Sequence, residues 1–461
     1  MSQARTKTPR RYVVMGAGEV GRHLALTLSR AGHTVTIIDH SEEKRPIVEE
    51  QLDVGFVHGN GSHVRTLEAA EVARCDLFVA ASSSDEANLA AALLAKRAGA
   101  PRTVVRLSTS DDITFHGSTY EQAFQADLLL STQLLATTRI LNHVLGYNTL
   151  EVEYLARGAL QLRKTHIEPG SILLDGTLAQ ARLPKHSLVL AFLSSQGEQR
   201  LVVPTGEDRA RPGDDALIFA RSSVIDEVER KISAHSKQLG LIVVAGGGKT
   251  ARSVVRALGR RTRRVKWIEL DRARAEALAA EFPSFEIIHG DATDPSTLAA
   301  EGVAEAHAFI ALTGHDESNL MACLLAQELG VRHITALVER SETSTLWHKV
   351  GLLDIVSPRV VAAERIREYI DNDYQASIST LDSGEARFVR RRIQPASPAA
   401  GARLADIVVP RGLIVAAILR GDDALVPGGD DRIEVGDEVI LFVHRSELAL
   451  VQLAFPGSEG L

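Results

Sequence analysis

Two glycine-rich stretches hold the residues of this chain that are best suited to bind a ligand. The first is Gly16-x-Gly18-x-x-Gly21, which lies between an apolar run and a segment of helical composition, and Asp39 follows the next apolar run. This spacing predicts a phosphate site, because the glycines permit a tight turn, a close backbone approach and close helix packing. The free N–H groups and the positive dipole end of the helix would face the anion. Asp39 is expected to lie at a cleft and outside the core, where it could accept hydrogen bonds from the adenosine ribose. Its charge disfavours the 2′-phosphate of NADP.

The second stretch begins at residue 246 and repeats the first without a gap. Gly246, Gly248, Ala251 and Glu269 stand where Gly16, Gly18, Gly21 and Asp39 stand in the first stretch. The run "GGGKT" also suggests a Walker phosphate loop, but that motif requires a glycine where Val243 stands. We therefore expect two nucleotide sites of the dinucleotide-binding type, with Lys249 and Thr250 in the first turn of the second helix.

The repeat extends over the whole chain. Four more pairs of segments match in order: "FVHGNGS" (56–62) with "IIHGDAT" (287–293), "SDEANLAAALLAKRAGA" (84–100) with "HDESNLMACLLAQELGV" (315–331), "LSTQLLATTRI" (130–140) with "VSPRVVAAERI" (356–366), and "RARPGDDALIFA" (209–220) with "RIEVGDEVILFV" (432–443). Repeats of this length indicate that each half is built from the same units.

Each half alternates short β-rich runs with Ala/Leu-rich helical segments, the pattern of a doubly wound parallel sheet. A helix near 132–146 or 358–371 follows, and then short strands separated by Gly/Pro turns. The fold class is therefore α/β: a duplicated Rossmann-like sheet, with a small α+β domain after each copy. We expect a basic tail over 1–11, Rossmann-like domains over 12–147 and 240–372, smaller domains over 148–235 and 375–455, and a joint between the halves at 232–240.

Other polar residues recur at matched positions near the expected sites. His58 and His289 are interpreted as strand-end residues, and Asn60 and Asp291 as candidates for adenine or ribose contacts. The acids at 85–86 and 316–317 favour a helix N-terminus, with Ser84 as a possible cap. His58 and His63 lack further ligands that recur, so no metal site is assigned.

Composition excludes several classes of protein. The 461 residues are 45% hydrophobic with a net charge of −7, so nothing favours binding to nucleic acid or to an acidic membrane surface. Two cysteines, Cys75 and Cys323, cannot form a disulfide framework. The chain has no stretch of about 18 apolar residues and no secretory signal, which predicts a cytoplasmic protein without direct membrane insertion.

The repeated "GAGEVG…D…HGN…SDEANL" and "GGGKTA…E…HGD…HDESNL" resemble the tandem RCK (KTN) domains that regulate potassium conductance, and both smaller domains resemble the RCK C-terminal domain. The order over nearly all the chain is similar to the TrkA family, the regulatory subunits of Trk-type bacterial potassium uptake systems. The resemblance implies a homotetrameric ring at the inner face of the membrane, attached to a potassium-translocating subunit of the TrkH or TrkG type. It also implies that NAD/NADH and ATP/ADP change the shape of this ring.

The resemblance also assigns residues to the two nucleotide sites. In the first half they are Gly16, Ala17, Gly18, Glu19, Val20, Gly21, Asp39, Asn60, Ser82, Glu86 and Arg106, the last of which would reach phosphate. In the second half they are Gly246, Gly248, Lys249, Thr250, Glu269, Asp291 and Thr313. Leu337 replaces Arg106 and Ala251 replaces the third glycine, so the two sites are expected to differ in ligand or affinity.

Two other functions remain as alternatives. An NAD-dependent oxidoreductase would need a proton-transfer group and a substrate-orienting cation, and neither recurs between the halves, so no catalytic residue is assigned. A transcription regulator would need a basic reading helix, which the sequence lacks.

Overall fold

The computed structural model describes most of both halves of the chain. The described residues are 9–108, 120–145, 159–194, 201–233, 240–340, 347, 349–352, 354–371, 377–381, 385–421, 423–449, 451 and 455. The start of the basic tail, 1–8, and residues 234–239 of the expected joint lie outside them. Among the described residues, no helix combines the length and the apolar character that crossing a membrane requires.

The first half opens with a six-stranded parallel sheet of order β3-β2-β1-β4-β5-β6. This order confirms the predicted doubly wound topology, in which the strand sequence reverses direction after β1. The strands are β1 (Arg11–Met15), β2 (Thr34–Asp39), β3 (Gly55–His58), β4 (Leu77–Ala80), β5 (Thr103–Leu107) and β6 (Leu128–Ser131). The helices are α1 (Glu19–Arg30), α2 (Val64–Ala69), α3 (Asp85–Arg97) and α5 (Thr132–Leu145).

The second half repeats this sheet in the order β13-β12-β11-β14-β15-β16. Its strands are β11 (Ile242–Ala245), β12 (Val265–Glu269), β13 (Glu286–His289), β14 (Ala308–Ala311), β15 (His333–Leu337) and β16 (Asp354–Val356). Its helices are α8 (Lys249–Leu258), α9 (Arg272–Glu281), α10 (Pro295–Ala300), α11 (Asp316–Glu328) and α13 (Pro358–Asp371).

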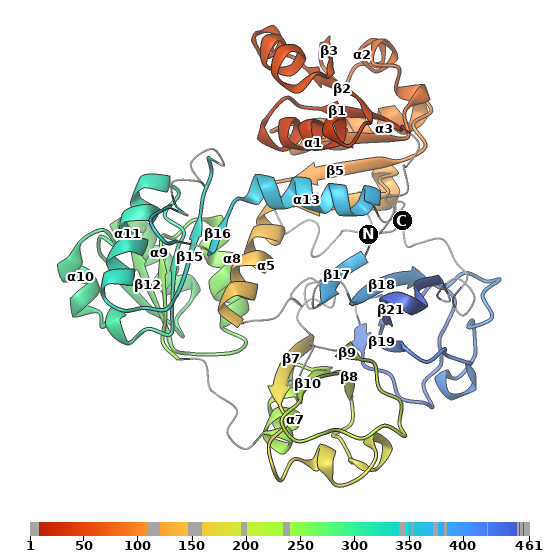
Figure 1. Ribbon diagram of the computed structural model, residues 1–461, viewed down its shortest axis with the longest axis vertical. Helices are drawn as coiled ribbons and strands as arrows, with labels where there is room; N and C mark the ends of the chain where they lie inside the picture. The colour runs from red at the N-terminus through yellow and green to blue at the C-terminus, as the bar shows by residue number, and fades with distance from the viewer. Residues whose placement is uncertain are drawn as a thin grey trace, which may run out of the picture. The chain divides into compact units, whose positions relative to one another are not determined.

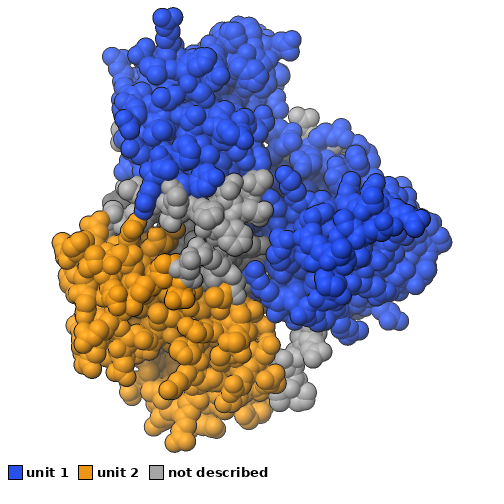
Figure 2. All heavy atoms as spheres, turned by 180° about the vertical axis from the view of Figure 1, so that it is seen from behind, with its two compact units in different colours: residues 1–144, 239–374, 461 blue, residues 145–238, 375–460 orange. Residues whose placement is uncertain are grey.

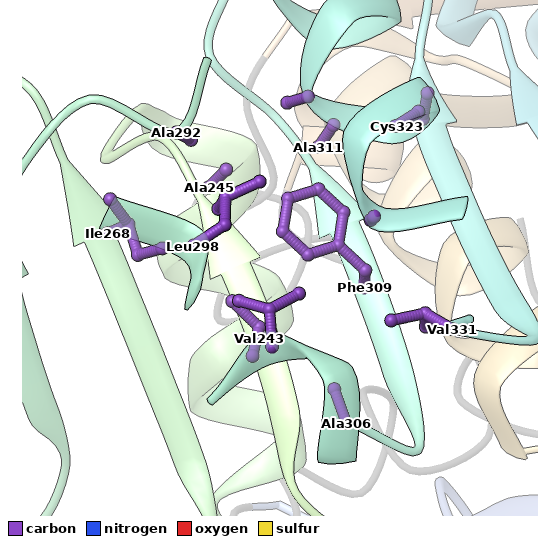
Figure 3. Packing of buried hydrophobic residues seen from close by; sticks show 14 of the residues in the cluster. Val243, Ala245, Ile268, Ala292, Leu298, Ala306, Phe309, Ala311, Cys323 and Val331 are labelled. Carbon is purple, nitrogen blue, oxygen red and sulfur yellow. The ribbon is translucent and has the colours of Figure 1, made fainter. Parts of the chain in front are cut away.

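The apolar side chains of the central strands form the core that holds each sheet against its helices. In the second half, one apolar cluster contains Phe309 of β14, Val243 of β11, Ile268 of β12 and Cys323 of α11 (Figure 3). All four are almost completely buried. Strands buried on both faces explain why these segments are continuous apolar runs in the sequence.

An antiparallel sheet follows each parallel sheet, as expected for the smaller domains. The first has the order β7-β10-β8-β9 and the second the order β17-β18-β21-β19-β20. The bounds are β7 (Leu160–His166), β8 (Ser187–Leu193), β9 (Leu201–Val202), β10 (Asp215–Arg221), α7 (Ile225–Ile232), β17 (Ser377–Leu381), β18 (Ala386–Arg392), β19 (Leu413–Arg420), β20 (Asp423–Leu425) and β21 (Glu438–His444).

The chain divides into two compact units, each of which contains elements of both halves (Figure 2). Unit 1 holds the two parallel sheets, from residues 1–144 and 239–374, and unit 2 holds the two antiparallel sheets, from residues 145–238 and 375–460. In unit 2 the small domains share one apolar core, in which Phe219 and Phe388 lie 6.4 Å apart between ring centroids. Burial of this surface stabilises the pairing of the two small domains.

Within unit 1, the helix that follows the parallel sheet of each half, α5 or α13, packs against the other half (Figure 1). Helix α13 of the second half packs along α1 of the first. In the reverse direction, Gln133 of α5 donates hydrogen bonds to the carbonyl of Lys249 (3.1 Å) and to Ser253 Oγ (2.7 Å) of α8. Each glycine-loop helix is therefore in contact with a helix from the opposite half.

Candidate functional site

The first glycine of each loop has a backbone conformation that side chains rarely adopt. Gly16 has φ +107° and Gly246 has φ +97°. A Cβ at Gly16 would lie 2.8 Å from the carbonyl oxygen of Ala81, and one at Gly246 would lie 2.4 Å from that of Leu312. Glycine is therefore required at both positions, where each loop turns tightly against the residues that follow the fourth strand.

The second glycine of each loop borders open space. Gly18 and Gly248 precede α1 and α8, and neither helix start has a side-chain cap. A Cβ at either position would meet no atom within 4 Å. Because the first N–H groups of a helix have no intrahelical acceptor, this space suits an anion such as a nucleotide diphosphate. The residues present thus fit the expected phosphate group.

Asp39 is buried, which corrects the expectation that it lies at a cleft and outside the core. Its side chain is only 4% exposed, and it accepts hydrogen bonds from Ala17 N (2.7 Å), Ser41 N (2.9 Å) and Lys44 Nζ (2.9 Å). Burial raises the pKa of this carboxyl, but hydrogen bonds from Ser41, Lys44 and Ala17 outweigh it, and the net pKa is lowered. Asp39 therefore holds the glycine loop in shape, in addition to any contact with a ribose.

We predict that Asp39→Asn destabilises the first half by about 2 kcal/mol at neutral pH, because the amide cannot accept all of these bonds. Since the folded-state pKa is lowered, the carboxylate contributes stability above its unfolded pKa and loses it as pH falls through the folded value. Denaturant unfolding at several pH values should show the parent and the variant converging below about pH 4. A constant difference between pH 7 and pH 3 would contradict this role.

Glu269 differs from Asp39 in the way it uses its carboxylate. It is 3% exposed, and Oε1 accepts hydrogen bonds from Asp271 N (2.8 Å) and Arg274 Nη1 (3.4 Å). Within the described part of the chain, its Oε2 atom is buried without a hydrogen-bond partner. A Cβ on Gly247 would lie 2.6 Å from this oxygen. The longer acid thus occupies space that the methyl group of Ala17 fills in the first loop.

We predict opposite tolerances at the two matched loop positions. Gly247→Ala should cost about 2 kcal/mol, because the new methyl group would meet Glu269 Oε2 and Leu278 Cδ1, which lies 2.7 Å from that position. Ala17→Gly should cost no more than about 1 kcal/mol. Chemical denaturation of both variants checks this, and the double variant Gly247→Ala/Glu269→Asp should recover most of the loss. No recovery would mean that Glu269 does not set this limit.

Two buried asparagines near the glycine loops were not predicted from the sequence. Asn88 Oδ1 accepts hydrogen bonds from Ser82 N (2.9 Å) and Ser82 Oγ (2.7 Å), and Asn88 Nδ2 donates to the carbonyl of Arg106 (2.8 Å). Asn319 makes the same bonds with Thr313 and Leu337. These side chains join the loop after the fourth strand to the end of the fifth. Their recurrence in "SDEANL" and "HDESNL" was the signal that could have revealed them.

The acids at the start of α3 and α11 also join neighbouring loops. Ser84 accepts a hydrogen bond from Ala87 N, which confirms the predicted cap. Asp85 accepts from Ser108 N and Oγ (both 2.9 Å), whereas Glu86 is exposed and accepts from Ser84 Oγ (3.0 Å). Asp316 accepts in the same way from Glu339 N (2.9 Å). A nucleotide contact by Glu86 remains a prediction.

Arg106 lies beside Ser82 at the edge of the first loop. Its Nη1 donates to the carbonyl of Ser82 (3.1 Å) and its Nη2 to Thr132 Oγ1 (3.3 Å). Burial lowers the pKa of the guanidinium. The charge of Arg359 lowers this pKa further, whereas the charges of Asp85 and Glu339 raise it, and the net pKa is lowered. Phosphate binding by Arg106 remains a prediction. Leu337, its counterpart, provides no charge in the second half.

The residues after β3 and β13 form turns. Asn60 Oδ1 accepts from Ser62 N (2.9 Å), and Asp291 Oδ1 accepts from Thr293 N (2.8 Å). Both are exposed, and adenine or ribose contacts by them remain predictions. His58 Nε2 lies 3.0 Å from the carbonyl oxygen of His40, as a strand-end residue with a hydrogen bond would. Among the described residues, no cluster of His, Cys, Asp and Glu could hold a metal ion.

Protein-family models match both halves of the chain. The family model described as "TrkA-N domain" matches residues 12–123 and 242–358, which cover most of the two parallel sheets. The family model described as "TrkA-C domain" matches residues 388–455 in the second small domain.

Full-length relatives and solved structures agree with these matches. The chain is 29% identical over 445 residues to the "Trk system potassium uptake protein TrkA homolog" of Archaeoglobus fulgidus, covering 96% of this chain and 100% of the relative. It is 26% identical to "Trk system potassium uptake protein TrkA" of Vibrio alginolyticus, covering 97% and 99%. The GsuK RCK domain has a similar fold, with a TM-score of 0.55, 18% identity and coverage of 97% of this chain and 95% of that one. The GsuK channel bound to NAD gives the same TM-score over 97% of this chain and 79% of that one.

Proposed function

Because the chain belongs to the family of proteins built from TrkA-N and TrkA-C domains, we propose that it is a nucleotide-binding regulatory subunit of a potassium uptake system. The observation that carries the proposal is the pair of matched glycine loops, each with an open helix N-terminus beside a buried acid. Relatives named as Trk potassium uptake proteins align with this chain over almost their whole length.

The ligands that we propose are NAD/NADH and ATP/ADP. Their shared adenosine diphosphate group fits a loop whose second glycine borders open space at a helix N-terminus. NADP is disfavoured, because a carboxylate ends the second strand of each sheet and would repel a 2′-phosphate. The GsuK channel, which has this fold, is described with NAD bound, and this supports the choice of ligand.

The proposed partner is a membrane potassium-translocating subunit of the TrkH or TrkG type. The chain would assemble as a homotetrameric ring and attach to the inner face of the membrane through this subunit. A nucleotide changes the activity of the partner only if it binds two shapes of the ring with different affinities.

A redox enzyme is the competing function, and no observation in the described residues favours it. Burial raises the pKa of Cys75 to about 12, and it also raises the pKa of Cys323, so neither thiol is a nucleophile near neutral pH. Oxidation of NADH by the purified chain with carbonyl substrates, which accept the hydride, would support the enzyme and count against the regulator.

Reconstitution tests the proposed function directly. Liposomes would contain the membrane subunit of the same uptake system, with and without the full chain, and potassium flux would be measured across a titration of ADP, ATP, NAD and NADH. We expect flux to depend on nucleotide only when the chain is present. A chain with Gly18→Val and Gly248→Val serves as the control. Flux that ignores the chain, or a nucleotide response that persists in the control, would contradict the proposal.

A further inference from the structure

An arginine from the second half lies at the start of the first glycine-loop helix. Arg359, in the first turn of α13, places Nη1 2.8 Å from Oε1 of Glu19, the first residue of α1. The same guanidinium is held by Glu339, through its carbonyl (3.2 Å) and its carboxylate (3.2 Å). Two carboxylates, one from each half, thus fix this cation beside the loop.

If no cation lay near it, the carboxylate of Glu19 would repel an anionic ligand. Its side chain is 22% exposed, and its Oε2 atom is buried with no hydrogen-bond partner in the described part of the chain. A partly buried charge interacts more strongly with its neighbours than one in bulk water does. The carboxylate stands at the helix N-terminus where a phosphate would bind. Among the described residues, only one of its two oxygens is in an ion pair, which it forms with Arg359.

The second half reaches the same balance of charge with different residues. Lys249 occupies the position of Glu19, Gln133 that of Arg359 and Leu337 that of Arg106. Gln133 contacts the first turn of α8 through the Lys249 carbonyl, much as Arg359 contacts Glu19. The formal charges at these three positions sum to one positive charge in each half, and in the first half Glu339 adds one negative charge beside Arg359. In the second site the loop supplies that charge itself, whereas in the first site it depends on α13.

We propose that Arg359 is a specificity-determining residue of the first nucleotide site, where it neutralises Glu19 and so admits the phosphates of a nucleotide. This inference rests on the proposed nucleotide-binding function. Anion binding at the first loop and docking of α13 on α1 then favour each other, as thermodynamic linkage requires. Ligand binding at the first site is thereby coupled to a helix of the second half. Ligand binding at the second site, where Lys249 supplies the positive charge, does not depend on an arginine from the other half.

Calorimetry on the full chain tests the proposal with ADP and with adenosine, which lacks phosphate. The background carries Gly248→Val, so that only the first site binds. Arg359→Gln, which introduces the residue found at the matched position 133, should weaken ADP binding about tenfold, or about 1.4 kcal/mol. Adenosine binding should change less than about twofold, because the lost interaction is with charge. High salt should reduce the difference between parent and variant.

Removal of the acid should reverse the effect. Glu19→Gln alone should bind ADP at least as tightly as the parent, and Glu19→Gln/Arg359→Gln should regain most of the lost affinity. Arg139→Gln is the matched control, because Arg139 makes a similar ion pair between the halves, at 2.7 Å from Glu364, which lies more than one helical turn along α13 from Arg359. This control should leave ADP affinity unchanged.

The outcomes separate this inference from the proposed function. A parent that binds neither ADP nor NAD would refute nucleotide binding itself. A parent that binds ADP, together with an Arg359→Gln variant of equal affinity, would refute the role of Arg359 alone. Equal weakening of ADP and adenosine, or failure of Glu19→Gln to rescue, would mean that Arg359 only docks α13, and this would overturn the inference.

Discussion

Gly18→Val is expected to lower the affinity of the first site for ADP or NAD by at least about 100-fold, or about 2.7 kcal/mol. Gly18 precedes α1, and a Cβ there would project into space that holds no protein atom within 4 Å. A branched side chain would fill the space through which phosphate reaches the free N–H groups of the helix. Its backbone, at φ −75° and ψ −175°, lies in the extended region that valine favours. The fold should therefore tolerate the change.

Calorimetry and thermal unfolding together check this expectation. The parent chain should bind at two sites, and Gly18→Val and Gly248→Val should each remove one of them with little change in melting temperature. The matched pair also reveals which ligand each site prefers. Retention of both sites at parental affinity in Gly18→Val would show that the nucleotide does not use this loop.

Gly21→Ala is expected to destabilise the first half by about 3 kcal/mol, since overpacking of a buried backbone contact has no flexible side chain to relax it. A Cβ at Gly21 would lie 1.9 Å from the carbonyl oxygen of Gly16. Gly16 cannot move away easily, because its N–H donates to the carbonyl of Ile38 at 2.8 Å and its φ is positive. Relief would require the whole loop to shift from the sheet.

The second half provides the comparison for this variant, because its loop accommodates a fully buried alanine at position 251. Ala251→Gly should cost about 1 kcal/mol, the usual difference between these residues in a helix. Denaturant unfolding of each variant gives the two values. If Gly21→Ala were as stable as the parent, the first loop would have room for a methyl group, as the second loop has. The close helix packing assigned to the third glycine would then be wrong.

Much of the fold could be read from the sequence, because its signals are local. Each parallel strand is a short apolar run, and the predicted helix over 358–371 coincides with α13 (Pro358–Asp371). The motif also predicted a tight turn at Gly16, where the structure has a positive φ. Periodicity and turn chemistry act over a few residues, so a linear sequence displays them.

The sequence by itself determined two matched sheets, two matched small domains and two glycine loops, since repeated local patterns fold into repeated elements. Only the tertiary structure decided that Asp39 is buried beneath its loop, that Asn88 ties two strand ends together, and that α5 and α13 are exchanged between the halves. These features depend on contacts between residues far apart in the chain. The free energy of such contacts comes from surfaces and hydrogen-bond partners that exist only after both halves have folded.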